Sequence, residues 1–351
     1  MLSHKKSLNI LKKTNALLEG HFILSSGLHS DKYIQCAKLL SFPNLAKKIC
    51  ISLSKKIRKN FKKIDVILAP AIGEAFYVDV FTRIMIWSIA AVGLNLVLGY
   101  GGMISFGHAA YIGLGGYTIA IFSYHEINNG FIQWPVALLI SGLAALLFGA
   151  LSLRTRGVYF IMITLAFAQM VYFLGVSADK YGSNDGLNIW NRSEFKINGL
   201  NFSIDDSLTF YYLIFFILVL IVFLVRRLVN SRFGMAIQGA RSNESRLEML
   251  GVPTYIYKLT AFVISGVICG LAGILQANFE RFVSPDMMDW PRSGELMFMV
   301  IMGGMGTLMG PVLGATAFLV LSEVLSSLTI HWHLIFGPLL IILVLYARGG
   351  L

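Results

Sequence analysis

Ionisable side chains are scarce inside the long apolar stretches of this sequence, and the few that occur there are His108, Glu295 and Glu323. Burying an ionisable group in hydrocarbon costs much free energy, so each of these residues is a candidate functional residue. One histidine and one carboxylate on separate stretches do not form a proton relay, and so few carboxylates argue against a carrier driven by protons or sodium. His108 and Asn95 are interpreted either as contacts for a solute or gate, or as packing residues.

The sequence lacks the common catalytic and metal-binding motifs. It contains no GxxxxGKS/T phosphate loop, HExxH, GxSxG or CxxC, which excludes ATP hydrolysis through a phosphate loop. Its three cysteines, Cys36, Cys50 and Cys269, show neither paired nor metal-ligand spacing. We therefore predict no catalytic residue, no metal ligand and no disulfide, and we expect any energy for the protein's work to come from a partner.

A basic connection between two apolar stretches has the pattern of a docking element. Within Ser231–Pro253 the sequence predicts a short helix over 236–250, with Gly251 as its stop. One stripe of that helix, at spacings of three and four, holds Ala240, Asn243, Glu244 and Leu247. The segment is either a solvated loop or a rigid helix that docks in a groove of a soluble subunit and transmits its movement.

Composition places these residues in a membrane protein. The 351 residues are 56% hydrophobic and 13% charged, with a mean hydropathy of +0.71, which excludes a soluble globular protein for most of the chain. The net charge of +11 is uneven, because residues 1–75 hold 14 Lys+Arg against 4 Asp+Glu and the rest holds 15 against 14. The chain therefore has two unlike parts, and we expect no nucleic-acid partner.

Apolar stretches long enough to cross a bilayer, at about 20 residues each, follow one another from residue 84. The eight stretches are 84–99, 105–123, 132–152, 157–177, 208–225, 258–276, 294–309 and 311–347. The last one divides near His331 to His333, which gives nine spans if both halves cross. Because lipid offers no partner for backbone groups, we predict an all-α polytopic membrane protein of about eight to nine transmembrane helices with glycine-rich helix breaks.

Lysine and arginine positions predict the orientation of the spans. The connection 226–258 and the turn after residue 152 are rich in arginine and are expected on the cytoplasmic side, which puts the acidic connection 178–207 outside. Traced backwards, the span 84–99 then begins outside, which places the basic first part on the wrong side. Either a helix is missing before residue 84, or one early span is re-entrant.

Glycines concentrate in the membrane part, which holds 31 of the 34. Small residues at four-residue spacing let helix backbones approach closely; the candidates for such packing are Gly266, Gly270, Gly306, Gly310 and Gly314. The alternative is that 99–107 (GYGGMISFG) and 303–310 (GGMGTLMG) interrupt helices and line a solute pathway, as in transporters with broken helices.

Five motifs occur in order along residues 85–351. They are LNLVLGYGGMISFGHAAYIGLGGYTIA (94–120), LRTRGVYFIMITLAFAQMVY (153–172), NDGLNI (184–189), SRFGMAIQGARSNESRLEMLGV (231–252) and MGGMGTLMGPVLGA (302–315). Through them the region resembles the LivM-type permease subunits of branched-chain amino acid ABC importers. The 231–252 motif is similar to that family's coupling segment, although Leu247 and Met249 stand where alanine is common.

The resemblance implies that residues 76–351 form half of a membrane channel in the plasma (inner) membrane of a bacterium. The implied partners are a LivH-type permease subunit, two ABC ATPase subunits, an external solute-binding protein and the lipid bilayer. ATP and Mg would bind to the partner ATPases, and no cofactor to this chain. The implied ATPase contact comprises Ala240, Asn243, Glu244 and Gly251, and the pathway candidates are Asn95, Ser105, Gly107, His108 and Thr164.

Residues 1–74 resemble a different family. The stretches ALLEGHFILSSGLHSDKYIQCAKLL (16–40) and IDVILAPAIG (64–73) are similar to the N-terminal third of orotate phosphoribosyltransferases. In that family the stretch here at Ser25, Ser26, Gly27 and Tyr33 helps to form the orotate pocket. The donor-binding loop of the family does not follow, so we predict an incomplete α/β soluble fragment without transferase activity.

The origin of the first part, the function and the solute remain open. The first part is either a spliced or mispredicted reading frame joined to an importer permease, or a genuine fusion, in which case assembly with partners is in doubt. An orotate-binding enzyme on a membrane anchor and a stand-alone secondary carrier are the competing functions. The resemblance leaves the solute open, because relatives of this permease type also serve urea and short amides.

Overall fold

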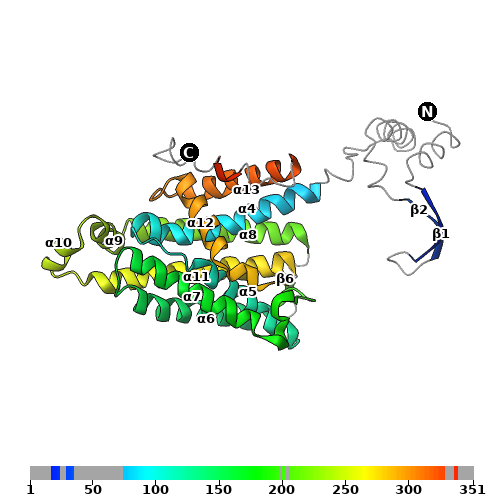
Figure 1. The fold of residues 1–351 in the computed structure, drawn as a ribbon, viewed down its shortest axis with the longest axis horizontal. Coiled ribbons are helices and arrows are strands. Elements are labelled where there is room, and N and C mark those ends of the chain that lie inside the picture. The colour runs from blue at the N-terminus through cyan, green and yellow to red at the C-terminus, as the bar shows by residue number, and fades with distance from the viewer. Residues whose placement is uncertain are drawn as a thin grey trace. The chain divides into compact units, whose positions relative to one another are not determined.

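The structure is a computed structural model of the full chain, and it divides into two compact units, Met1–Tyr77 and Val78–Leu351. Secondary structure is described for residues 17–23, 29–34, 74–197, 200–202, 206–328 and 336–338. Figure 1 shows the elements of both units, and each unit is described here by itself.

The described part of the first unit holds a pair of antiparallel strands and the first residues of a helix that continues into the second unit. Strand β1 (Leu17–Ile23) pairs with β2 (His29–Ile34), and the register shifts between Glu19 and Phe22. Of the orotate-pocket-like residues, Tyr33 lies in β2 opposite Leu18. Ser25, Ser26 and Gly27 lie outside the described residues.

The second unit is a bundle of apolar helices (Figure 1). Its long helices are α4 (Glu74–Asn95), α5 (His108–Tyr124), α6 (Gly130–Ser152), α7 (Val158–Val176), α8 (Ser207–Val229), α11 (Thr254–Glu280), α12 (Trp290–Gly303) and α13 (Gly310–Leu328). Each of the eight apolar stretches of the sequence overlaps one of them. The prediction of an all-α polytopic membrane protein is therefore confirmed.

The number of spans is not confirmed. Among the described residues, five helices are long and apolar enough to cross a membrane, namely Val78–Tyr100, Gly130–Ser152, Val158–Val176, Ser207–Val229 and Thr254–Glu280. Helix Gly310–Ser326 is apolar but shorter. The division near His331 to His333 lies outside the described residues, so the count of eight to nine stays a prediction.

Short elements close the ends of the bundle. Strand β3 (Leu187–Asn188) pairs with β6 (Phe282–Val283), and β4 (Phe195–Ile197) pairs with β5 (Leu200–Phe202). The single turns η2 (Asp179–Tyr181), η3 (Ser183–Asp185) and η4 (Pro285–Met288) lie in the same connections. Side-chain caps start the long helices there, because Asn129 and Asp206 accept hydrogen bonds from the first free backbone N–H groups of α6 and α8.

Helix α11 packs against both α5 and α6 through small residues. A Cβ on Gly266 would collide with Ala145, and one on Gly270 would collide with Ser141. Gly115 of α5 lies directly on the backbone of Gly270, so these helix axes approach as closely as backbones allow. Without a hydrophobic drive between helices in lipid, such close packing is what holds them together.

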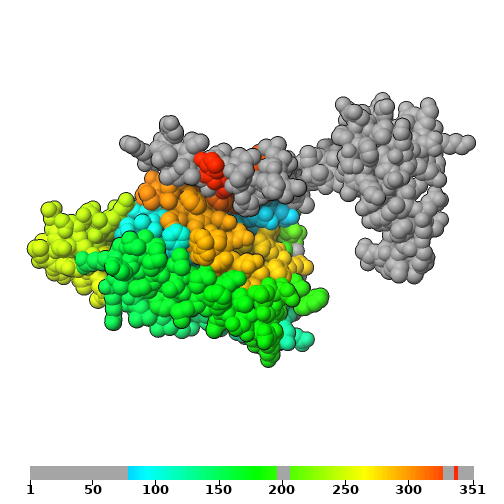
Figure 2. Space-filling view, viewed as in Figure 1, coloured from blue at the N-terminus to red at the C-terminus, as the bar shows by residue number. Residues whose placement is uncertain are grey.

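The outer faces of α6, α7 and α8 are apolar and exposed. In Figure 2 the side chains of α6 and α7 (green) form a continuous face of the bundle. Exposed side chains on these helices include Leu147, Leu174 and Phe216 at 62%, 71% and 65% exposure. Exposed apolar patches of this extent are unusual in soluble monomers, and this face fits the lipid acyl chains.

The arginine-rich connections lie at one end of the bundle, as the charge pattern predicts. The turn between α6 and α7 meets the connection after α8 through Arg156 and Glu244, 3.5 Å apart. At the opposite end, Arg83 and Trp87 of α4 line a cavity together with Glu280, the last residue of α11. Helix α4 therefore begins at the end of the bundle that the charge rule assigns to the outside.

The close approach of α5 and α11 gives a direct test of packing. We expect Gly115→Ala to lower the free energy of unfolding by about 1–3 kcal/mol, because its methyl group would press on the backbone of Gly270. Gly294→Ala in α12 is the matched control, since the nearest atom to its Cβ is a Phe106 ring carbon 3.9 Å away. Thermal unfolding of both variants in detergent measures the difference, and equal midpoints would contradict the packing described above.

Candidate functional site at the helix breaks

Two helices of the bundle are interrupted by glycine-rich segments, as the sequence predicts. The first break, 101–107, separates α5 from α4, which ends in one wide π turn, η1 (Leu96–Tyr100). The second break, 304–309, separates α12 from α13. Gly102 and Gly306 have φ of +66° and +77°, values that suit glycine and almost no other residue. Gly306 thus lies in a break, whereas Gly310 and Gly314 lie on α13, against α12.

The two breaks are joined by the side-chain amide of Asn95. Its Nδ2 donates to the carbonyl of Thr307 at 2.8 Å, and its Oδ1 accepts from the backbone nitrogen of Gly306 at 3.0 Å. A Cβ on Gly99 would collide with Gly306 and with Asn95 itself. Asn95 is 2% exposed, so one buried amide satisfies two backbone groups that the second break would otherwise leave unpaired.

His108 begins α5 and is held at both ring nitrogens. Its Nε2 lies 3.0 Å from the hydroxyl of Ser265, and its Nδ1 lies 3.1 Å from that of Ser105. Because Ser265 donates its proton to the carbonyl of Gly93 at 2.6 Å, it accepts from Nε2–H, and Nδ1 then accepts from Ser105. Both nitrogens of this fully buried ring are satisfied, which is the arrangement of a packing histidine.

The remaining pathway candidates surround His108 at the first break. Thr164 of α7 accepts a hydrogen bond from the backbone nitrogen of Phe106 at 3.3 Å and donates to Ile161 at 2.9 Å. Gly107 faces the carbonyl of Thr164, and a Cβ at this position would come within 3.1 Å of that oxygen. The structure therefore brings Asn95, Ser105, Gly107, His108 and Thr164 to the two breaks. All five are buried, and their role in a pathway stays a prediction.

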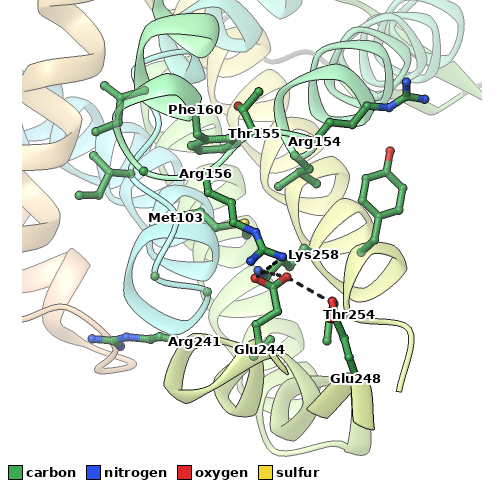
Figure 3. Close-up of a pocket in the computed structure, with 18 residues that line it drawn as sticks. Met103, Arg154, Thr155, Arg156, Phe160, Arg241, Glu244, Glu248, Thr254 and Lys258 are labelled. Atoms are coloured by element: carbon green, nitrogen blue, oxygen red, sulfur yellow. Dashed lines mark hydrogen bonds and ion pairs between the residues drawn. The ribbon is translucent and has the colours of Figure 1, made fainter. Parts of the chain in front are cut away.

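A cavity of about 400 Å³ lies beside the first break at the arginine-rich end (Figure 3). Its walls are the first break, the turn between α6 and α7, the connection after α8, and the start of α11. Its charged lining residues are Arg154, Arg156, Arg241, Glu244, Glu248 and Lys258. The sequence marked most of them only as indicators of orientation.

The expected single helix over 236–250 is wrong. The connection forms two helices, α9 (Arg232–Ser242) and α10 (Glu244–Met249). Asn243 divides them with extended backbone angles, φ −160° and ψ 98°, and its side chain accepts from the backbone nitrogen of Arg246 at 3.0 Å. An asparagine side chain that caps a new helix competes with helix continuation, and here the cap is the more favourable. Gly251 follows the second helix with φ +82°.

Glu244 fastens this connection to the membrane helices. Its carboxylate lies 2.6 Å from Lys258 Nζ and 3.5 Å from Arg156, and it accepts from Thr254 Oγ1 at 3.4 Å (Figure 3). Burial alone would raise the pKa of Glu244, but the hydrogen bond and charge of Lys258, with the charge of Arg156 and the Thr254 hydroxyl, outweigh it and lower that pKa. The carboxylate is therefore ionised at neutral pH.

The four residues expected to contact an ATPase divide between two sides of the connection. Ala240 is 5% exposed and the side chain of Glu244 is 21% exposed, and Glu244 bonds to the membrane helices. Asn243 and Gly251 are on the surface. The structure adds Met249 and Leu250, exposed at 84% and 75%, which the periodicity of a single helix did not bring onto the expected stripe.

A second cavity, of about 720 Å³, lies at the opposite end of the bundle. It contains the other two ionisable residues singled out in the sequence, Glu295, which pairs with Arg292 at 2.9 Å, and Glu323. Acidic residues outnumber basic ones in its lining. Across the part of the chain that is described, no group of three or more His, Cys, Asp or Glu residues is close enough to hold a metal ion.

Glu244 and its partners Lys258, Arg156 and Thr254 form a cluster whose contribution to stability should depend on pH. Because the folded-state pKa of Glu244 is lowered, this contribution is complete above its ordinary value of 4.5 and is lost as the pH falls through the folded value. We expect Glu244→Gln to cost about 1 kcal/mol or less at neutral pH, since the groups are partly exposed. Thermal unfolding should show this cost shrinking in acid.

Glu248→Gln is the matched control for the cluster. Glu248 accepts from Thr254 at 2.9 Å, which a glutamine carbonyl preserves, and it makes no ion pair among the described residues. A cost for Glu248→Gln as large as that for Glu244→Gln, or one that does not change with pH, would contradict the role of the ion pairs.

Two sets of known proteins are similar to different parts of this chain. Orotate phosphoribosyltransferases of Caldicellulosiruptor bescii and Caldicellulosiruptor saccharolyticus are 54% and 53% identical over 66 residues, which cover 19% of this chain and 34% of each enzyme. The similarity falls at the N-terminus. No solved structure matches the chain.

The membrane part has its own relatives. The high-affinity branched-chain amino acid transport system permease proteins LivM of Salmonella typhimurium (strain LT2) and Escherichia coli (strain K12) are each 29% identical over 295 residues, covering 78% of this chain and 69% of theirs. The family model described as branched-chain amino acid transport system / permease component matches residues 76–345. The chain therefore belongs to the family of branched-chain amino acid transport system permease components.

Proposed function

We propose that residues 76–351 are the permease subunit of an ATP-driven ABC importer that carries branched-chain amino acids across the inner membrane of a bacterium. The family assignment over residues 76–345 carries this proposal. The pair of helix breaks in contact through Asn95 supports it, because broken helices place satisfied backbone and polar side chains at membrane depth, where a solute path needs them.

The proposed importer requires partners, since no phosphate-loop motif occurs in this chain. They are a LivH-type permease subunit that completes the channel, two ABC ATPase subunits that bind ATP and Mg, and an external solute-binding protein. This chain acts as half of the pathway rather than as an enzyme. Asn95, Ser105, Gly107, His108 and Thr164 are the proposed pathway residues.

We place the contact with an ATPase on the exposed side of the 231–253 connection. Asn243 and Gly251 lie there, and the exposed Met249 and Leu250 offer apolar side chains to a groove. Ala240 and Glu244 contribute to the same contact indirectly. They lie on the opposite side of the connection and hold the two short helices against the membrane part. Solvent-exposed apolar residues at a helix end are typical anchors for a protein partner.

Transport is tested in proteoliposomes that contain this chain with its LivH-type and ATPase partners. With the binding protein outside and ATP available to the ATPases, we expect leucine uptake that stops when ATP or the ATPase subunits are omitted. Uptake that follows an ion gradient and continues without the ATPases would overturn the proposal in favour of a secondary carrier.

Docking is tested by the paired change Met249→Asp with Leu250→Asp. A charge on each exposed apolar residue should prevent burial against a partner, so we expect the ATPase subunits to be lost on co-purification while the membrane part stays folded. Trp190→Asp is the control, because Trp190 is exposed at 81% in the connection at the other end of the bundle. Retention of the ATPases by the double variant would contradict this placement.

A second candidate function follows from the N-terminal similarity to orotate phosphoribosyltransferases. That similarity covers 34% of the enzyme, and we propose that the fragment is inactive because the donor-binding loop of the family does not follow it in the sequence. A fused chain that does not assemble is the corresponding alternative to the importer.

The inactivity of the fragment has a direct assay. We expect the purified chain, given orotate and the phosphoribosyl donor, to form no orotidylate above a heat-denatured control. Orotidylate formation that disappears on Tyr33→Ala would establish the enzyme instead.

A further inference from the structure

Arg241, near the end of α9, contacts both helix breaks. Its Nη1 donates a hydrogen bond to the carbonyl of Gly99. Its aliphatic stem lies on Gly102, where a Cβ would come within 2.7 Å of the Arg241 Cγ. The same Nη1 is the neighbour of Gly306, at 3.6 Å from the position a Cβ would take. One side chain of the connection therefore reaches the first break and the second break together.

The carbonyl of Gly99 needs a donor from outside its own helix. In the irregular turn after α4, the backbone N–H groups of residues 101–103 donate to the carbonyls of residues 96–98, at N···O distances of 3.0–3.2 Å. Gly99, the next carbonyl in line, accepts from Arg241. A guanidinium suits this place, because it stays charged and carries several N–H donors in one plane.

The connection thus has two separate attachments to the membrane part. Glu244 binds Lys258 and the turn before α7, whereas Arg241 points away from Glu244 toward the breaks (Figure 3). On the same helix as Arg241, Ile237 and Ala240 are buried, so α9 is also packed against the membrane part through apolar side chains. Any movement of α9 that Glu244 and these apolar contacts allow must displace Arg241 relative to Gly99.

We propose that Arg241 is the positioning residue through which the 231–253 connection controls the geometry of both helix breaks. The chain of contacts runs from Arg241 to Gly99, and from the neighbouring Asn95 to Gly306 and Thr307. This proposal rests on the proposed function, in that the movement comes from an ATPase subunit docked on the connection. It assigns to one arginine the coupling step between that subunit and the solute path.

The first test needs only the full chain in lipid nanodiscs. Hydrogen–deuterium exchange is measured for peptides covering 99–107 and 303–310 in Arg241→Ala. We expect exchange about tenfold faster in both, the size expected for loss of one hydrogen bond from a charged donor. Arg246→Ala is the control, because its side chain has no hydrogen bond or ion pair among the described residues. Unchanged exchange in Arg241→Ala, or an equal effect of Arg246→Ala, overturns the proposal.

Protection of α11 serves as the folding control in this measurement. If Arg241→Ala loses the protection of α11, Arg241→Lys is compared with the wild type instead. Lysine keeps an aliphatic stem on Gly102 and can donate one hydrogen bond to the carbonyl of Gly99. We expect the lysine variant to fall between the wild type and Arg241→Ala. If exchange in Arg241→Lys is as fast as in Arg241→Ala, an aliphatic stem with a single hydrogen bond is not enough to hold the breaks.

The second test uses the complete importer in proteoliposomes. We expect Arg241→Ala to retain the ATPase subunits and their ATP hydrolysis but to move about tenfold less solute per ATP, with Arg241→Lys partly restored. Wild-type solute per ATP in Arg241→Ala overturns the coupling role. If the wild-type chain itself retains no ATPase, the proposed function fails, and the exchange measurement still decides whether Arg241 holds the breaks.

Discussion

The absence of water from the bilayer interior is the constraint on which this structure depends. A backbone that leaves helical geometry there must find its hydrogen-bond partners in protein. In this bundle the partners are a few polar side chains: Asn95 for the second break, Thr164 and Ser105 for the first, and Arg241 for the carbonyl of Gly99. Each of these four side chains therefore pairs a backbone group that the breaks leave without a helical partner.

The sequence predicted the helices and both breaks, because apolar length and glycine clusters are local properties that the bilayer turns directly into structure. It did not predict that α9 and α10 are separate. That outcome rests on the capping geometry of Asn243, a competition between two local structures that periodicity alone does not resolve. The sequence identified the candidate residues at the breaks individually but not their contacts. Asn95, for example, bonds to residues more than two hundred positions away, which only the folded chain brings near it.

For Glu244, the sequence identified the residue but did not predict its ion-pair partners. The stripe pattern selected it, and the charge rule selected Arg156 and Lys258 on separate connections, yet nothing in spacing joins the three. The same charge rule assigns the start of α4 to the outside, and in the bundle that start lies at the end opposite the arginine-rich connections. The positions of lysine and arginine in short connections indicate the side of a membrane, whereas ion pairing depends on which turns the helix packing brings together.

The junction between the two breaks consists of a few non-covalent bonds, one from Arg241 and two from Asn95. At about 1 kcal/mol net for each, exchanging this set for another costs only a few kcal/mol. Two arrangements of such a junction differ by an amount that the unequal affinity of a bound partner for them can reverse. Glycine-mediated packing around α11 holds the rest of the bundle closely together, so the breaks are where a rearrangement on partner binding would cost the least free energy.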